Sequence, residues 1–311
     1  MILDAEGIAN LACLKFDDYE ETKGKIGKSA QHEVQAESQT VVLFQNQGEE
    51  IFAINLSMVS RLEKITSSQI TNIGDKIFFK HAGNAIRLIQ LDDFLPVAKM
   101  TSLPDKMYVI IPQLLKNPIG IICSKIVDVL ERPILFTSNV LPCRGLLGSC
   151  IINEKLTLFL DIHQLVNIIN PPEPQNEPFF KNKKVLVVED TPFYSLTTSR
   201  FLTDFQVNFE VVNNGAQALE RINSDHYDLI LTDIEMPEMD GLELCRKIRS
   251  SPPIKNMPVV ALVSSITHSF LERSKEVGLD GYELKLDKEG VRNMLNHFFI
   301  QQPVHNYPSV R

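Results

Sequence analysis

The chain has 311 residues, of which 44% are hydrophobic and 23% charged, and its formal net charge at neutral pH is −8. This composition is typical of a globular protein with room for two ordinary domains, and it excludes a disordered chain. The acidic balance argues against a nucleic-acid partner, because such a partner is usually met by a basic face.

Membrane and secretion signals do not appear in the sequence pattern. No apolar run approaches the roughly 20 residues of a membrane-spanning helix, and the first residues, MILDAEGIANLACLKF, lack the basic and apolar regions of a signal peptide. The five cysteines form neither a CxxC pair nor a Cys/His cluster, which fits reduced thiols. We therefore expect a cytoplasmic protein with no direct membrane insertion and no zinc site.

Residues 1–38 are expected to be an extension and not a domain. Ile2–Asp4 resembles the end of a strand, and Ala5–Leu14 has the length of a short helix. The polar, aperiodic stretch that follows is typical of a linker.

Residues 39–169 are predicted to be rich in β-structure. About eight short apolar or alternating runs, from TVVLFQN to KLTLFLDI, are separated by small polar, glycine or proline breaks. Such runs predict an antiparallel barrel or sandwich. The apolar spacing of residues 162–169 predicts a closing amphipathic helix.

Proline marks the boundary between two different patterns. Residues 170–182 contain four prolines among polar residues, which predicts a semi-rigid interdomain linker. Residues 183–301 then alternate five apolar strands with five helices. This alternation predicts an α/β domain with a doubly wound, five-stranded parallel sheet that is buried on both faces. Residues 302–311 are expected to form a C-terminal tail.

Acidic residues stand where the first and third of these strands end. Glu189 and Asp190 follow KVLVV, Asp233 ends LILTD, and Ser264 and Lys285 end the fourth and fifth strands. The carboxyl ends of parallel strands meet at one edge of the sheet, where such folds bind ligands. Crowded carboxylates favour a Mg²⁺ ion with oxygen ligands. Metal-neutralised Asp233 can then attack a phosphoryl donor, with the Lys285 charge and the Ser264 hydroxyl facing the phosphoryl oxygens.

These motifs resemble the receiver domain of two-component response regulators. VLVVED resembles the acid pair, LILTDIEMPEMDG the acceptor with its turn, VVALVSS the switch hydroxyl, and GYELK the lysine strand. The resemblance covers residues 183–301 and implies phosphorylation at Asp233 with Mg²⁺ as cofactor. It implies metal binding by Glu189 (through water), Asp190, Asp233 and the backbone carbonyl of Glu235, and switching or phosphate contact by Ser264, Tyr282 and Lys285.

Two features depart from the receiver pattern. Leu286 follows Lys285 where most receivers have proline, which puts the usual cis-proline turn in doubt. Glu235 and Ile266 occupy positions that tune the lifetime of the acyl phosphate, so no rate is predicted. A phosphatase of the haloacid dehalogenase type would need an aspartate two residues after the nucleophile, and Glu235 stands there instead.

Residues 39–169 resemble the CheW-like coupling domain of bacterial chemotaxis proteins. The resemblance rests on the order of FAINLSMVSRLEKI, AIRLIQLDDFLP, MYVIIPQ and KLTLFLDIHQLV. It implies two small five-stranded barrels that serve as a docking module. The beginning of residues 1–38 resembles the tail of a preceding domain of the same kind.

The order of the two domains resembles CheV-type chemotaxis proteins, and also the C-terminal part of a CheA-type hybrid histidine kinase. The first resemblance implies an adaptor that takes phosphate from a chemotaxis histidine kinase and modulates its coupling to chemoreceptors and CheW-like coupling proteins. The second implies a regulatory fragment whose receiver is a phosphate sink. A scaffold with a silent receiver is a third possibility. The chain has no ATP-binding motif, so it is not expected to be a kinase by itself.

Overall fold

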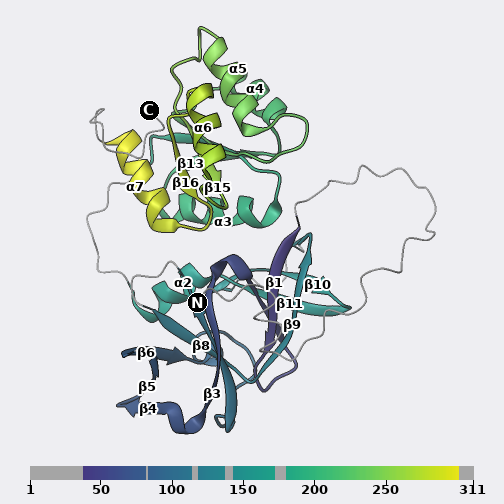
Figure 1. Ribbon diagram of the computed structural model, residues 1–311, viewed down its shortest axis with the longest axis vertical. Helices are drawn as coiled ribbons and strands as arrows, with labels where there is room; N and C mark the ends of the chain where they lie inside the picture. The colour runs from purple at the N-terminus through teal and green to yellow at the C-terminus, as the bar shows by residue number, and fades with distance from the viewer. Residues whose placement is uncertain (1–37, 82, 114–117, 137–142, 172–179, 301–311) are drawn as a thin grey trace, which may run out of the picture. The chain divides into compact units, whose positions relative to one another are not determined.

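The computed structural model describes residues 38–300 except 82, 114–117, 137–142 and 172–179. The described residues fall into two compact units, one up to residue 171 and the other from residue 180 (Figure 1). The expected N-terminal extension, most of the proline-rich linker and the C-terminal tail lie outside the described residues. Within the described part, no helix combines the length and the apolar character needed to cross a membrane.

The first unit contains a five-stranded sheet with a fully buried central strand. Its strands are β1 (Gln39–Gln45), β2 (Ile51–Asn55), β9 (Lys125–Arg132), β10 (Leu146–Ile152) and β11 (Lys155–Leu160). The order is β10-β11-β2-β1-β9, and every residue of β2 is buried. β2 pairs antiparallel with β1 and parallel with β11, so the sheet joins the beginning of the unit to its end.

The second sheet of this unit has six strands. They are β3 (Val59–Thr66), β4 (Ile70–Ile73), β5 (Lys76–His81), β6 (Asn84–Ile89), β7 (Lys106–Pro112) and β8 (Ile119–Cys123). The order is β3-β7-β8-β6-β5-β4. The β-rich, two-part architecture is confirmed, but this half has one strand more than expected. The additional strand is β4, a largely exposed edge strand that forms a hairpin with β5 through Gly74, which has a φ of 62°.

Short helical turns connect these strands. They are the 3₁₀ turns η1 (Leu56–Met58), η2 (Ser67–Gln69) and η3 (Leu91–Asp93).

Helix α2 (Ile162–Ile169) closes the unit where the apolar spacing predicted a helix. The Asp161 side chain caps it by accepting a hydrogen bond from the backbone N–H of Gln164 (2.9 Å). The Gln164 side chain in turn accepts one from the N–H of Gly145 (3.0 Å). Gly145 has a φ of 92°, and a Cβ there would lie 2.8 Å from Cδ2 of Leu165. A glycine is therefore required where the chain passes this helix.

The second unit has the predicted parallel sheet. Its strands are β12 (Lys184–Val188), β13 (Asn208–Val212), β14 (Leu229–Asp233), β15 (Val259–Val263) and β16 (Gly281–Leu284). The order is β13-β12-β14-β15-β16, and every neighbouring pair is parallel. All five carboxyl ends therefore lie at one edge of the sheet.

Helices cover both faces of this sheet. They are α3 (Pro192–Asp204), α4 (Gly215–Ser224), α5 (Gly241–Ser250), α6 (His268–Val277) and α7 (Lys288–Phe299). Side chains of α4, α5 and α6 share one core with Leu186 and Ile230, whereas those of α3 and α7 share the other with Val187 and Leu231. Neighbouring strand residues alternate between the two cores because their side chains point to opposite faces.

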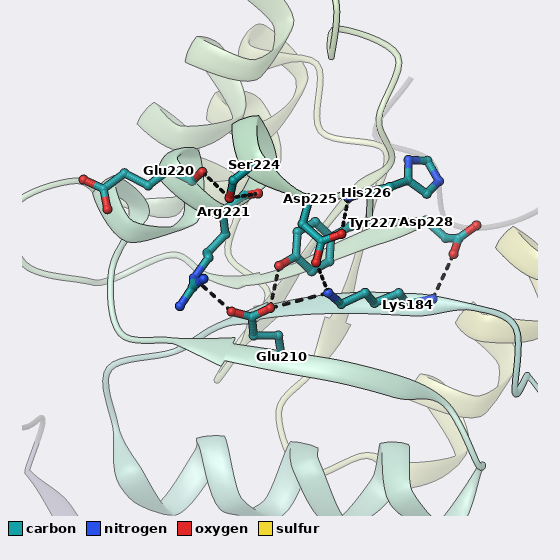
Figure 2. A network of polar contacts seen from close by, with 9 residues as sticks. All are labelled: Lys184, Glu210, Glu220, Arg221, Ser224, Asp225, His226, Tyr227 and Asp228. Atoms are coloured by element: carbon teal, nitrogen blue, oxygen red, sulfur yellow. Dashed lines mark hydrogen bonds and ion pairs between the residues drawn. The ribbon is translucent and has the colours of Figure 1, made fainter.

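Polar contacts stabilise the amino-terminal part of this sheet (Figure 2). Lys184, the first residue of β12, forms ion pairs with Asp225 and Glu210, and its ammonium lies 4.6 Å from the centre of the Tyr227 ring. Buried Tyr227 donates a hydrogen bond to Glu210 (2.7 Å), which also pairs with Arg221 of α4 (2.9 Å). These contacts connect β12 with β13, α4 and the segment that precedes β14.

Candidate functional site

Three carboxyl groups gather where β12 and β14 end. Glu189 and Asp190 directly follow β12, and Asp233 is the last residue of β14, its parallel neighbour. One carboxylate oxygen from each residue lies within 4.8 Å of the others. Glu189 and Asp233 are buried, whereas Asp190 is half-buried. The structure thus brings together the three acids that the strand-end pattern indicated.

Lys285 places a positive charge among these acids. It follows β16, and its ammonium lies 2.8 Å from Oδ2 of Asp233 and 3.1 Å from Oε2 of Glu189. The lysine side chain is only 4% exposed. A charged group at this depth must be paired, so the two carboxylates stabilise the ammonium in its buried position.

Burial and mutual repulsion change the protonation of the acids. Burial raises the pKa of Glu189 to about 8, although the Lys285 ammonium offsets part of the shift, and Asp233 adds to it. Burial also raises the pKa of Asp190, and the nearby Asp233 charge adds to this effect. Burial alone would lower the pKa of Lys285, but Glu189 and Asp233 outweigh it and raise this pKa. Three acids around one lysine leave an excess of negative charge, which a divalent cation would relieve.

The oxygen atoms of this cluster fit the requirements of Mg²⁺. Oε2 of Glu189 and Oδ2 of Asp233 are buried and have no well-aligned hydrogen-bond donor among the described residues, although Lys285 lies within ion-pair distance of both. Mg²⁺ prefers carboxylate and carbonyl oxygens and keeps several waters. Glu189, Asp190 and Asp233 offer such oxygens, and exposed Glu235 stands two residues beyond Asp233.

Backbone contacts hold Asp233 in place. The N–H of Ile234 donates a hydrogen bond to Oδ1 of Asp233 (2.6 Å), and the hydroxyl of Thr232 donates one to the Asp233 carbonyl (2.8 Å). Gly241, the first residue of α5, donates its N–H to the Ile234 carbonyl (3.1 Å). A Cβ at Gly241 would lie 2.0 Å from the carbonyl oxygen of Asp233. Helix α5 can approach Asp233 this closely only because residue 241 has no side chain.

Ser264 and Tyr282 lie at the two strands that follow β14 in the sheet order, β15 and β16. Ser264 is the first residue after β15 and is exposed at the same edge of the sheet. Tyr282 lies within β16, opposite Ala261 of β15, and its half-buried ring packs edge-on against Phe270 of α6 at 5.6 Å. The structure therefore places the Ser264 hydroxyl at the same edge of the sheet as the acid cluster, and an aromatic contact between β16 and α6.

Two further residues of the cluster were not predicted from the sequence. Buried Thr191, which precedes α3, donates its N–H to Oε1 of Glu189 (3.2 Å). Tyr194, in the first turn of α3, places its ring centre 4.2 Å from the Lys285 ammonium. Both residues follow the acid pair by a few positions, so the first helical turn after β12 was the signal that could have indicated them.

The turn after Lys285 has an unusual backbone. No cis peptide bond occurs among the described residues, and Leu286 has a φ of 72° while its side chain is buried. A left-handed conformation costs a non-glycine residue about 1–2 kcal/mol. The burial of the leucine side chain offsets this cost, and the turn forms without proline.

Comparison with known proteins assigns both halves of the chain. Residues 185–296 match the response regulator receiver domain, and residues 40–170 match the CheW-like domain. The second unit is therefore a receiver domain with the α/β fold described above. The chain joins a CheW-like domain to a receiver domain.

Two curated relatives share most of this chain. The sensor histidine kinase CheAY of Helicobacter pylori is 27% identical over 253 residues, which cover 76% of this chain and 32% of that protein. A gliding motility regulatory protein of Myxococcus xanthus is 24% identical over 256 residues, which cover 78% of this chain and 32% of that protein. The chain thus spans about a third of the length of these relatives.

Solved receiver domains align with part of the chain. The signal receiver domain of a histidine kinase from Syntrophus aciditrophicus is 27% identical, with coverage of 40% of this chain and 96% of that one and a TM-score of 0.36. The receiver domain of a sensor histidine kinase from Pseudomonas aeruginosa, solved with magnesium in its active-site cleft, is 25% identical. It covers 37% of this chain and 96% of its own, with a TM-score of 0.36.

Proposed function

We propose that this chain is a chemotaxis signalling adaptor whose receiver domain accepts a phosphoryl group at Asp233 from a histidine kinase. The observation that carries the proposal is the cluster of Glu189, Asp190, Asp233 and Lys285 at the carboxyl edge of the sheet. The same chain carries a CheW-like domain. Phosphorylation then modulates how this domain couples a kinase to its receptors.

Asp233 is the nucleophile in this proposal. Its carboxylate attacks the phosphorus of a phosphohistidine, so that a P–O bond forms while the P–N bond breaks. The imidazole leaves with the electron pair and takes up a proton from solvent. The N–H of Ile234 orients the carboxylate for this attack. The product is an acyl phosphate on Asp233.

Glu189, Asp190, Asp233 and the backbone carbonyl of Glu235 would hold Mg²⁺. When bound, this ion supplies positive charge that offsets the charge of the phosphoryl oxygens. Lys285 leaves one carboxylate and pairs with a phosphoryl oxygen instead. The Ser264 hydroxyl donates a second hydrogen bond to the phosphoryl group. Each charge-assisted bond is worth about 1.5–3 kcal/mol. Two such bonds approach the ~5.5 kcal/mol that inverts a 1:99 equilibrium between two conformations.

The conformational change on phosphorylation is transmitted through Tyr282 and acts on the CheW-like domain. The Tyr282 ring packs on Phe270, and in this proposal a shift of Tyr282 that follows the Ser264 hydroxyl changes the surface formed by β16 and α6. The CheW-like domain is the docking module, and its partners are a chemotaxis histidine kinase, chemoreceptors and other CheW-like coupling proteins. In this role the protein acts in the cytoplasm and binds no nucleic acid.

Phosphorylation is tested by incubating the chain with acetyl phosphate and Mg²⁺. We expect the intact mass to rise by one phosphoryl group, because acetyl phosphate replaces the phosphohistidine as donor. Asp233→Asn should abolish the adduct, and EDTA should suppress it. Asp225→Asn, a matched change at the amino-terminal part of the sheet, should leave it unchanged. A wild-type chain that forms no adduct, or an adduct that persists in Asp233→Asn, would refute the proposal.

Docking is tested by capture on the cytoplasmic signalling tips of chemoreceptors together with their kinase. We expect the full chain to be retained, and a chain without residues 39–169 to be lost, because the CheW-like domain is the proposed docking module. Retention of the receiver domain alone would reverse this assignment.

A second candidate function is the C-terminal regulatory part of a CheA-type hybrid histidine kinase, with the receiver as a phosphate sink. The similarity to the sensor histidine kinase CheAY over 76% of this chain favours it. An ATP-binding domain encoded in the same reading frame upstream of Met1 would decide for this candidate. A stop codon and promoter directly upstream would decide for the adaptor.

A further inference from the structure

Tyr194 contacts Lys285 at the centre of the acid cluster, although it is itself neither an acid nor a lysine. It lies in the first turn of α3, which begins with Pro192 directly behind the acid pair. Its side chain is buried, with the residue only 7% exposed. The Lys285 ammonium lies 4.2 Å from the centre of its ring, and Phe193 contacts the ring edge-on at 5.4 Å.

Among the described residues, the Lys285 ammonium therefore has three close partners, which are of two kinds. Two are carboxylates, at 2.8 Å from Asp233 and 3.1 Å from Glu189, and the third is the aromatic ring of Tyr194. A cation near the face of an aromatic ring is attracted by the ring's quadrupole, and the attraction grows when water is excluded. Both side chains are almost fully buried, so the ring takes a place that water would otherwise occupy.

We propose that Tyr194 is a positioning residue of the phosphoryl site, whose ring holds the Lys285 ammonium against Asp233 and Glu189. The proposal rests on the proposed function of Asp233 as phosphoryl acceptor. A lysine has four rotatable side-chain bonds, and ordering them costs conformational entropy. The ring lowers this cost before the phosphoryl group arrives, because it confines the ammonium to the position from which it reaches a phosphoryl oxygen.

The test uses beryllofluoride, a phosphoryl mimic that binds an aspartate carboxylate without a covalent donor. The full chain is titrated with beryllofluoride at saturating Mg²⁺, and the affinity is measured by calorimetry. Tyr194→Leu keeps an apolar side chain but removes the ring, so we expect the affinity to fall by about thirtyfold, the size of a desolvated cation–π contact. Tyr194→Phe keeps the ring and should remain within about twofold of wild type.

Phe201→Leu is the matched control. Phe201 lies on the same helix, is equally buried, and has the Lys288 ammonium at 6.0 Å from its ring centre, away from the acid cluster. The substitution removes an aromatic ring from α3 but leaves the ring that contacts Lys285 in place. We expect beryllofluoride affinity to stay within about twofold of wild type.

A double-mutant cycle separates positioning from a general structural role. If Tyr194 acts through Lys285, then Tyr194→Leu should have no further effect on affinity in a Lys285→Met background. An equal loss in both backgrounds would overturn the proposal. Nuclear magnetic resonance gives an independent readout: the upfield ring-current shift of the Lys285 ε-methylene protons should persist in Tyr194→Phe and vanish in Tyr194→Leu.

The outcomes distinguish the two proposals. A wild-type chain that does not bind beryllofluoride would refute the phosphoryl site itself. A wild-type chain that binds it, together with a Tyr194→Leu variant of equal or higher affinity, would refute only the role of Tyr194.

Discussion

Lys285→Met is expected to lower the free energy of unfolding of the receiver domain by about 3–5 kcal/mol when Mg²⁺ is absent. The change removes the only cation within ion-pair distance of buried Glu189 and Asp233 among the described residues. Buried carboxylates are then left without a compensating cation, and Glu189, whose pKa is already raised by burial, is driven to take up a proton. Calorimetry of the full chain in EDTA measures the effect, and the transition that shifts on Mg²⁺ addition belongs to the receiver domain. Saturating Mg²⁺ should recover most of the loss, because ligand binding stabilises the folded state.

Glu189→Gln is a control for this charge balance, because it is expected to change the free energy of unfolding in the opposite direction. It removes one acid from a cluster with excess negative charge, so in EDTA it should raise the free energy of unfolding by about 1–3 kcal/mol at pH 8. The pKa of Glu189 is raised on folding, from an ordinary value of 4.5 to about 8. Its contribution to stability is therefore complete below pH 4.5 and is lost as the pH rises towards 8. The advantage of the variant should grow across this interval. A variant that is less stable than wild type throughout would contradict the charge balance.

Gly241→Ala is expected to destabilise the receiver domain by about 2–3 kcal/mol and to slow its phosphorylation at least about tenfold. Its Cβ would lie 2.0 Å from the carbonyl oxygen of Asp233, so either α5 or the Asp233 backbone must move. Alanine in a helix gains about 0.5–1 kcal/mol over glycine, which is too little to offset the clash. Thermal unfolding and the rate of the acetyl phosphate adduct measure the two effects.

Gly278→Ala is the matched control for this prediction. Gly278 ends α6 with a φ of 75°, and a Cβ there would lie no closer than 3.6 Å to a neighbouring atom, Nε of Arg249. Alanine there costs about 1 kcal/mol in backbone strain but does not touch Asp233. The rate of adduct formation should remain that of wild type. If Gly241→Ala lowered stability but left the rate equally unchanged, the backbone contact would have no influence on Asp233.

The receiver fold and its acid cluster could be predicted because two simple rules apply to them. A strand buried on both faces is continuously apolar, as in KVLVV and VVALV, and the carboxyl ends of parallel strands share one edge. These rules bring Glu189, Asp190, Asp233 and Lys285 together even though they are far apart in the chain. The gathering of these four residues therefore follows from the strand order alone.

Other features depend on contacts that no pattern in the sequence displays. The contact of Tyr194 with Lys285 depends on how the first turn of α3 faces the end of β16, which is set by the packing of both elements on the sheet. Strands β3 and β4 were not among the expected runs; β4, ITNI, is mostly exposed and lacks the apolar alternation of a core strand. Its pairing with β5 compensates for weak local preference.

The strand order of the CheW-like domain has a consequence for the order in which it folds. The first sheet needs Ile51 of β2 to pair with Thr157 of β11, whereas the second sheet is complete in sequence once β8 has been made at Cys123. Contacts between residues so distant in sequence slow folding, because a long loop must close first. During synthesis, one edge of β2 therefore remains unpaired until β11 has been made, while the second sheet assembles. An edge of this kind is a site for pairing with other chains, so early chain termination after β9 should favour aggregation.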